Sequence, residues 1–172
     1  PAETRATQSE QILTHLLQSQ VWTNAKMIGS YASFRGEVNT WPILERAAAT
    51  HKAIALPRVV DKASALQFHH VVTSHGEWPL TDGAFGVREP DPSCPVVPLE
   101  AIELLLVPAL AVSPAGARIG WGGGFYDRTL LATPKAKRIA LVFHSQVQPD
   151  VPASAHDQPI DGWVSENGLF WV

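Results

Sequence analysis

The chain is short of cysteine, of charge and of long apolar runs, and each shortage argues against a class of protein. Cys94 is the only cysteine among 172 residues, so no disulfide can form within the chain, and a lone thiol fits a reducing, cytoplasmic location. No apolar run approaches the roughly 20 residues that a membrane-spanning helix needs. Charged residues make up 17% and the net charge is -3, so the basic excess typical of nucleic-acid-binding proteins is missing.

The composition is that of a globular protein. Hydrophobic residues make up 45% of the chain, and 172 residues predict one domain that spans residues 1–172. The first residues, Pro1–Thr4, contain neither a basic nor an apolar segment, so we expect no secretory signal here. The lack of an initial Met indicates an N-terminus that has been trimmed or processed.

Apolar residues alternate between helical and strand-like spacing along the chain. Helical spacing predicts helices over 8–20, over 41–50 behind the candidate N-cap Thr40, and over 125–132. Short apolar segments predict strands over 27–31, 53–57, 66–72, 101–110 and 138–143. The stretch 73–98 is rich in Pro, Gly, Asp and Ser, which predicts a long functional loop. This alternation predicts a layered α/β fold that binds ligands beyond the carboxyl ends of its strands.

The most informative segment is Arg118–Arg128, which holds four glycines between positions 120 and 124. Backbone without β-carbons, placed before a helix, is a natural seat for phosphate. The segment lacks the Gly-Lys-Ser/Thr ending of a P-loop and the later acidic residue of a dinucleotide fingerprint. A flexible turn is the alternative interpretation. The charged side chains around the glycines, Arg118, Asp127 and Arg128, favour a phosphate site.

Several acidic residues could complete such a site. Asp127 opens the predicted helix, where it would either favour the helix dipole or bind Mg²⁺, for which one or two carboxylates plus substrate phosphates suffice. Asp157 and Asp161 are candidates for a second carboxylate, and Asp157 alone would be a turn residue. Glu37 precedes the second helix, where it is either a solvated acid or a hydrogen-bond acceptor for a polar heterocycle.

Other candidates fit structural roles better. His69, His70 and His75 match no common zinc-ligand spacing. No Ser-His-Asp nucleophile motif is present, which argues against a covalent hydrolase. Among six tryptophans only Trp121 is placed to face a ligand, and the segment 85–90 is by itself an ordinary turn.

Taken in order, these segments resemble the 5-formyltetrahydrofolate cyclo-ligase family, also called 5,10-methenyltetrahydrofolate synthetases. The resemblance covers nearly the whole chain and is strongest from Val107 to Leu130, around the glycine run. One glycine run would be a weak signal, but the ordered set of supporting segments is specific: 31–33 with Glu37 and Thr40, 55–59, 83–90, and Pro152 with His156–Asp157.

The resemblance implies a three-layer α/β/α sandwich with a mostly parallel central sheet. It also implies that ATP and Mg²⁺ drive conversion of 5-formyltetrahydrofolate to 5,10-methenyltetrahydrofolate, with ADP and phosphate released. In the family scheme the formyl oxygen attacks the γ-phosphate of ATP, and N10 then closes the ring as phosphate leaves. The partners implied are small molecules, with no membrane and no nucleic acid, and we expect a monomer.

The resemblance also assigns roles to individual residues. Arg118, as a cationic clamp, and Tyr126 are the catalytic candidates, and Tyr126 would either pack on a ring or bond a phosphate. The metal ligands implied are Asp127 and Asp157. The ATP-binding set implied is Arg118, Gly120, Trp121, Gly122, Gly123, Gly124, Phe125 and Tyr126. The folate-binding set implied is Ala32, Glu37, Trp121, Gly122, Gly123, Gly124 and Phe125.

The chain departs from the family pattern at two places. Family members begin with a basic segment whose cations help to hold ATP, whereas this chain has only Arg5 before Lys26, so either that segment was removed or ATP binding is compromised. Trp121 stands where many members carry Tyr or Arg, and Gly123 where some carry Lys. A folate- or nucleotide-binding module without turnover is therefore the alternative function, and a sugar-phosphate isomerase is a weaker third.

Overall fold

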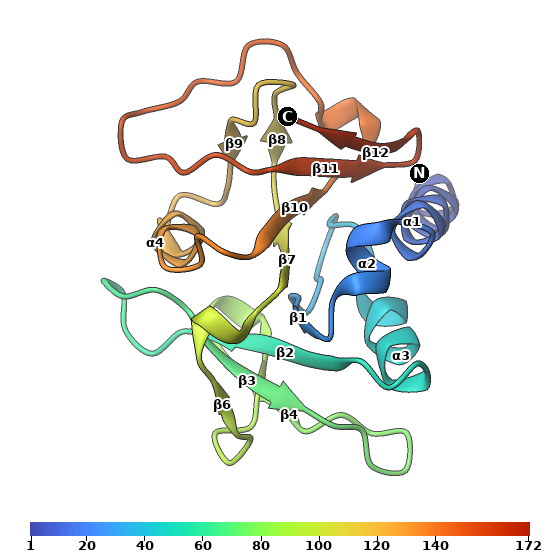
Figure 1. Ribbon diagram of the computed structural model, residues 1–172, viewed down its shortest axis with the longest axis vertical. Coiled ribbons are helices and arrows are strands. Elements are labelled where there is room, and N and C mark those ends of the chain that lie inside the picture. The colour runs from blue at the N-terminus through green and yellow to red at the C-terminus, as the bar shows by residue number, and fades with distance from the viewer.

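The chain is built around one eight-stranded sheet, and the computed structural model describes all residues 1–172 (Figure 1). The α-helices are α1 (Ala2–Leu17), α2 (Gln20–Asn24), α3 (Trp41–Ala49) and α4 (Phe125–Leu131). The strands are β1 (Met27–Gly29), β2 (Ala53–Arg58), β3 (Gln67–Val71), β4 (Leu80–Asp82), β5 (Arg88–Pro90), β6 (Val96–Val97), β7 (Leu104–Pro108), β8 (Ala111–Val112), β9 (Arg118–Ile119), β10 (Lys137–Leu141), β11 (Gly162–Ser165) and β12 (Gly168–Trp171). Single 3-10 turns cover Ala84–Gly86, Leu99–Ala101 and His144–Gln146.

The strand order in the main sheet is β12-β11-β10-β7-β1-β2-β3-β6. The run from β11 to β2 is parallel, and β3 and β12 flank it as antiparallel strands. At the centre, Ile28 of β1 lies between Ile54 of β2 and Leu104 of β7. Two small antiparallel hairpins, β4-β5 and β8-β9, lie outside this sheet. The predicted mostly parallel sheet is confirmed.

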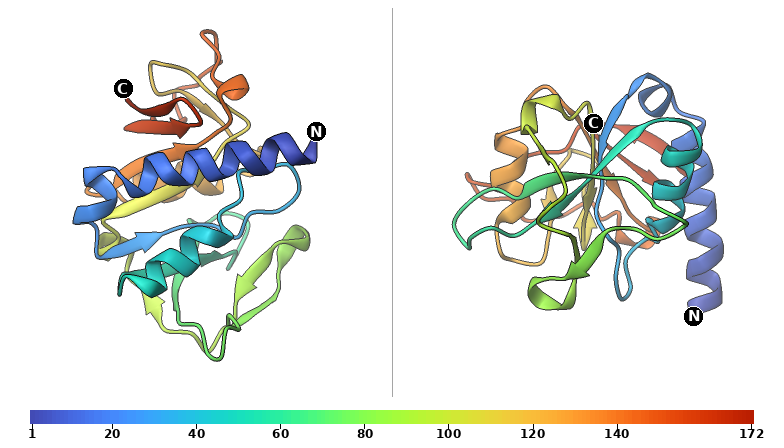
Figure 2. Two further views of the ribbon diagram at one scale, coloured as in Figure 1. Left: turned by 90° about the vertical axis from the view of Figure 1, so that its right-hand side faces the viewer. Right: turned by 90° about the horizontal axis from the view of Figure 1, so that it is seen from below.

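Helices cover both faces of the sheet, which makes three layers. The helices α1, α2 and α3 lie on one face and α4 lies on the other, as the view from below in Figure 2 shows. On the first face Leu16 and Leu44 join the main apolar core with Ile28, and on the second Leu130 packs with Leu105. All residues of β7 are buried, as a strand covered on both faces must be. No helix is long and apolar enough to cross a membrane.

The first helix differs from its prediction at both ends. It begins at Ala2 instead of residue 8, because its first turns are exposed and carry no apolar stripe that the spacing could reveal. It ends at Leu17, where Ser19 starts the new helix α2. The Ser19 hydroxyl accepts a hydrogen bond from the Trp22 backbone N–H, at 3.3 Å, and this cap separates the two helices.

Thr40 occupies the predicted N-cap position of α3, but its side chain does not cap the helix. The Thr40 hydroxyl donates to the Tyr31 carbonyl and accepts from the Ser33 N–H, so it holds the segment that follows β1. The Asn39 side-chain oxygen accepts from Trp41 N instead, at 3.1 Å. The predicted helix and its N-cap position are therefore confirmed, although no capping hydrogen bond comes from the Thr40 side chain.

The predicted loop 73–98 contains three short strands, β4, β5 and β6, and a 3-10 turn. Strands of two or three residues with exposed positions give no clear apolar alternation, so sequence spacing missed them. The strands β8 and β9, of two residues each, are also too short for a pattern, and the four-residue strands β11 and β12 were not predicted either. The predicted strand over 101–110 begins only at Leu104, because Leu99–Ala101 forms a 3-10 turn.

Candidate functional site

A cavity of about 680 Å³ lies at the carboxyl ends of the parallel strands β1, β2 and β7. Tyr31, Val59 and Pro108, which follow or end these strands, form part of its wall. This is where ligands collect in parallel α/β sheets. Every residue to which the family resemblance gave a role lies on the wall: Ala32, Glu37, Arg118, Gly120, Trp121, Gly122, Gly123, Gly124, Phe125, Tyr126, Asp127 and Asp157.

The β8-β9 hairpin brings the glycine run back to the end of β7. Arg118 on β9 donates from Nη1 to the Pro108 carbonyl oxygen, at 2.9 Å, and this bond joins the two strand ends. Beyond β9 the backbone takes left-handed conformations, with φ of +95° at Gly122 and +71° at Gly124. Only glycine adopts such angles without steric cost. The run therefore turns sharply into α4 and leaves exposed backbone facing the cavity.

Arg118 is a buried cation in the cavity wall, with only 7% of its surface exposed. Its Nη2 lies 3.8 Å from Oδ1 of Asp127, and its guanidinium carbon lies 5.6 Å from the centre of the Tyr126 ring. Burial lowers the pKa of Arg118 from its usual value, and the nearby Asp127 charge opposes that shift. An arginine pKa starts high enough that the side chain remains cationic, so the cavity carries a fixed positive charge.

Arg128 does not face the cavity, although the sequence placed it among the phosphate-site charges. Its Nε donates to the Ser64 carbonyl at 3.0 Å, and its Nη2 donates to the carbonyls of Lys62 and Gly123 at 3.0 and 3.1 Å. The guanidinium also lies over the Phe125 ring, 5.0 Å from its centre. Arg128 therefore holds the glycine run against the 62–64 loop, a structural role.

Two carboxylates, Asp127 and Asp157, lie on the cavity wall. Asp127 Oδ1 accepts from the Gln158 N–H at 3.2 Å, so the residue next to Asp157 is bonded to Asp127. Asp157 Oδ2 accepts from Ser154 N at 2.7 Å. No group of three or more His, Cys, Asp or Glu side chains could hold a metal by itself. The pair fits Mg²⁺, which needs one or two carboxylates and takes its other ligands from phosphate and water.

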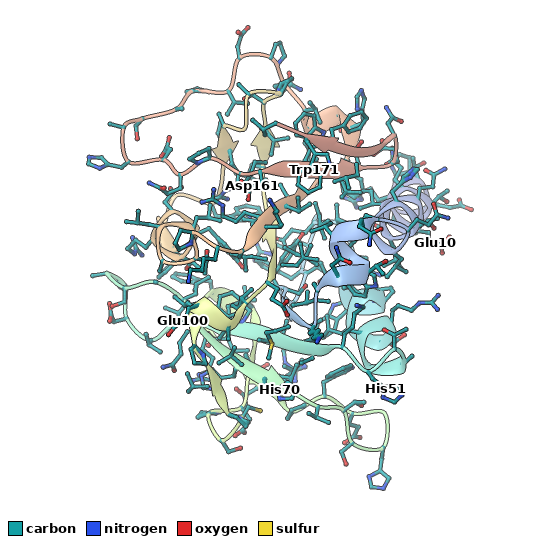
Figure 3. The ribbon with its side chains drawn as sticks, in the orientation of Figure 1. Glu10, His51, His70, Glu100, Asp161 and Trp171 are labelled. Carbon is teal, nitrogen blue, oxygen red and sulfur yellow. The ribbon has the colours of Figure 1, made fainter.

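Asp161 is not part of this pair. It lies just before β11, where it forms an ion pair with Arg138 at 3.2 Å and accepts the Arg138 backbone N–H at 2.8 Å (Figure 3). The interpretation of Asp161 as a second metal carboxylate is therefore wrong. Its charge already has a partner, and it links β10 to β11.

Glu37 and Trp121 also lie on the cavity wall. Glu37 Oε2 accepts from Phe34 N at 3.0 Å, and Oε1 accepts from the indole Nε1 of Trp121 at 3.3 Å. Burial raises the pKa of Glu37, and the two hydrogen bonds partly oppose that rise. The Trp121 side chain is 61% exposed and lies beside the Phe34 ring, at 6.4 Å between centroids. Flat apolar surface thus lies next to a carboxylate acceptor.

Both tyrosines of the chain lie on the cavity wall, and both are protonated. Burial raises the pKa of Tyr126 above its usual range, and the negative charge of Glu37 adds to the rise. The same two causes, in the same order, raise the pKa of Tyr31 well above its usual value. The two phenols therefore serve as neutral hydrogen-bond donors.

Sequence reasoning missed the residues that the 83–90 segment brings to the wall. Glu89 is buried, and its Oε2 accepts from Val59 N at 2.6 Å while Oε1 accepts from Ala84 N at 3.4 Å. It thereby anchors the turn that carries Phe85, which has φ of +60° and lies 6.4 Å from the Phe125 ring. The segment 83–90 counts toward the family resemblance, but the sequence assigns neither Glu89 nor Phe85 a role, because by itself the segment indicates only a turn.

The fold and this wall define a class: an α/β protein whose strand ends form a cavity lined by a buried cation, glycine backbone, carboxylates and aromatic rings. The family model of the 5-formyltetrahydrofolate cyclo-ligase family matches residues 1–166. The chain belongs to that family.

Relatives and solved structures agree with this membership. The chain is 30% identical over 165 residues to the 5-formyltetrahydrofolate cyclo-ligase of Haemophilus influenzae, covering 89% of this chain and 83% of the relative. It is 26% identical over 168 residues to a probable 5-formyltetrahydrofolate cyclo-ligase of Caenorhabditis elegans, covering 92% and 82%. The structure of Aquifex aeolicus 5,10-methenyltetrahydrofolate synthetase superposes with a TM-score of 0.87 at 27% identity, covering 99% of this chain and 84% of that one.

Proposed function

We propose that this protein converts 5-formyltetrahydrofolate to 5,10-methenyltetrahydrofolate at the cavity described above, using ATP and Mg²⁺. The observation that carries the proposal is the sharing of one cavity by two kinds of recognition group. A buried cation, glycine backbone and two carboxylates line this cavity together with a further carboxylate acceptor and flat aromatic surface. Family membership supplies the reaction.

The phosphate end is formed by Arg118, the glycine run and the carboxylate pair. The guanidinium of Arg118 is held by Pro108 and is buried, so it attracts phosphate oxygens without first being ordered. Phosphoryl transfer needs positioning and charge stabilisation more than covalent help from the protein. Asp127 and Asp157 would hold Mg²⁺, which when bound neutralises phosphate charge.

The folate end is formed by Glu37 and its aromatic neighbours. The Glu37 carboxylate accepts hydrogen bonds and so suits the N–H groups of a pteridine ring. Ala32, without a long side chain, leaves the wall open beside it, and Phe34 and Trp121 offer faces for ring packing. Trp121 belongs to the glycine run, which supports the binding of the two substrates side by side.

The proposed reaction balances as two displacements. The formyl oxygen forms a bond to the γ-phosphorus, and the bond from that phosphorus to ADP breaks. The N10 lone pair then attacks the formyl carbon, the carbon–oxygen bond to phosphate breaks, and N10 loses its proton to solvent. Arg118 stabilises the charge on the transferring group, and the protein holds N10 near the formyl carbon.

The test is an absorbance assay on the full natural chain with 5-formyltetrahydrofolate, ATP and Mg²⁺. We expect methenyl absorbance in the near ultraviolet to rise with time, and to stay flat when ATP is omitted or the metal is removed by a chelator. Calorimetry on the same sample measures folate binding. Folate binding without any ATP-dependent rise would reject the proposal in favour of a binding module without turnover.

A further inference from the structure

Two buried side-chain polar atoms have no hydrogen-bond partner in the protein, the Tyr31 hydroxyl and Arg118 Nε. Both residues lie on the wall of the cavity. Arg118 has other partners and a place at the phosphate end. Tyr31 is only 4% exposed, and its hydroxyl has no role in holding the fold.

The unpaired Tyr31 hydroxyl lowers the stability of the folded state, and the fold does not require it. The Tyr31 ring belongs to the main apolar core with Val38 and Leu141, and a phenylalanine would fill the same space. A buried hydroxyl without a partner destabilises the folded state, because it loses water and gains nothing in return. Other buried hydroxyls are bonded within the protein, as those of Ser19 and Thr133 are. The exception therefore points to a bond that forms only with ligand.

Tyr31 lies where the main cavity meets a smaller one of about 180 Å³, and Glu37 and Trp121 line both cavities as well. The phenol keeps its proton, so it offers a donor beside the Glu37 acceptor. A donor next to an acceptor complements a ring edge that carries a carbonyl beside an N–H. The pteridine of a folate has such an edge.

We infer that the Tyr31 hydroxyl donates a hydrogen bond to the ring carbonyl of the bound pteridine, next to the N–H groups that Glu37 accepts. This inference rests on the proposed function. With this hydrogen bond, Tyr31 favours a ligand whose ring carries a carbonyl group at this edge. Trp121 lies at the same place, because its indole N–H donates to Glu37.

The test compares Tyr31→Phe with the wild-type chain in two measurements that should move in opposite directions. Without ligand, the melting temperature of Tyr31→Phe should stay the same or rise, because the variant loses only an unpaired hydroxyl. With ligand, the dissociation constant and KM for 5-formyltetrahydrofolate should rise about three- to tenfold, the usual worth of one hydrogen bond. The KM for ATP should not change.

Ser19→Ala is the matched control, because Ser19 is a buried hydroxyl with partners inside the protein and is not among the residues that line the cavity. It should lower the melting temperature by about 2–4 °C and leave folate binding unchanged. A second ligand, the analogue with a 4-amino group in place of the carbonyl, should bind wild type and Tyr31→Phe equally well. Equal weakening of both ligands in Tyr31→Phe would overturn the assignment to the carbonyl.

The outcomes separate this inference from the proposed function. If the wild type turns over and Tyr31→Phe binds folate with unchanged affinity, the inference is overturned and the proposed function stands. The same holds if Tyr31→Phe has a lowered melting temperature without ligand. Folate binding that weakens in Tyr31→Phe, in a wild type without turnover, rejects the function and supports the inference. A wild type that binds no folate overturns both.

Discussion

Adding one methyl group at Gly120 should damage activity far more than stability. A β-carbon there would lie 2.6 Å from Nη1 of Arg118, whereas ordinary contact begins at 3.4 Å, so the guanidinium nitrogen must move by about 0.8 Å (3.4 − 2.6). A misplacement near 1 Å can cost about 100-fold in rate. We therefore expect Gly120→Ala to lower kcat/KM by roughly 10- to 100-fold, mostly through the phosphate end.

The stability cost of Gly120→Ala should be small, because the atom that must move is the end of a flexible side chain. The Arg118–Pro108 bond, 2.9 Å long, would weaken, which is worth about 1 kcal/mol and roughly 2–4 °C in melting temperature for a chain of this size. Gly76→Ala is the contrasting control. Gly76 has φ of +80° with nothing within 4 Å of its added β-carbon, so this variant should lose about 1–2 kcal/mol and keep its activity. Normal kcat/KM in Gly120→Ala would refute the placement of Arg118 at the phosphate.

Two further predictions concern the acidic residues. Asp127→Asn should lower kcat by about 100-fold or more and weaken Mg²⁺ activation, with the melting temperature nearly unchanged. Asp161→Asn should instead lower the free energy of unfolding by about 1 kcal/mol and keep kcat within about twofold of wild type. Equal kinetic losses in both would contradict the metal assignment. The folded-state pKa of Glu37 is raised, so its contribution to stability is fully present below its unfolded-state pKa, about 4.3, and is lost as pH rises through the folded-state value. Glu37→Gln removes this titration, so in urea unfolding the free energy of unfolding of wild type relative to this variant should fall as pH rises from about 4.3 through the folded-state pKa. Folate binding should also weaken. A stability difference that does not depend on pH would refute the buried-carboxylate assignment.

The parallel core could be predicted because each strand carries its own signal. Leu104–Pro108 is apolar at every position, which is typical of a strand that is covered on both faces. The glycine run could also be recognised from the sequence, since glycines and charged residues stand close together there. Both signals are local, so tertiary contacts were not needed to find them.

The roles of single charged residues could not be predicted in this way, because they depend on partners far along the chain. Asp157 and Asp161 are alike in sequence, but Asp161 pairs with Arg138 on the neighbouring strand and Asp157 faces the cavity. Arg118 and Arg128 both flank the glycines, but Arg128 bonds to carbonyls of the 62–64 loop. A strand pairing or a loop approach decides each case, and neither leaves a pattern in the sequence.

Charged residues of the candidate site and charged residues with structural roles differ in how many protein groups they bond. Arg128 and Asp161 direct their bonding atoms at several protein groups, which leaves little for a ligand. Asp157 and Arg118 are held by fewer bonds: one backbone hydrogen bond fixes each side chain, Arg118 adds only the ion pair with Asp127, and both residues line the cavity. One such bond orders the side chain before the ligand arrives, so binding need not pay for ordering it. The Tyr31 hydroxyl, with no hydrogen-bond partner in the protein, is the limiting case.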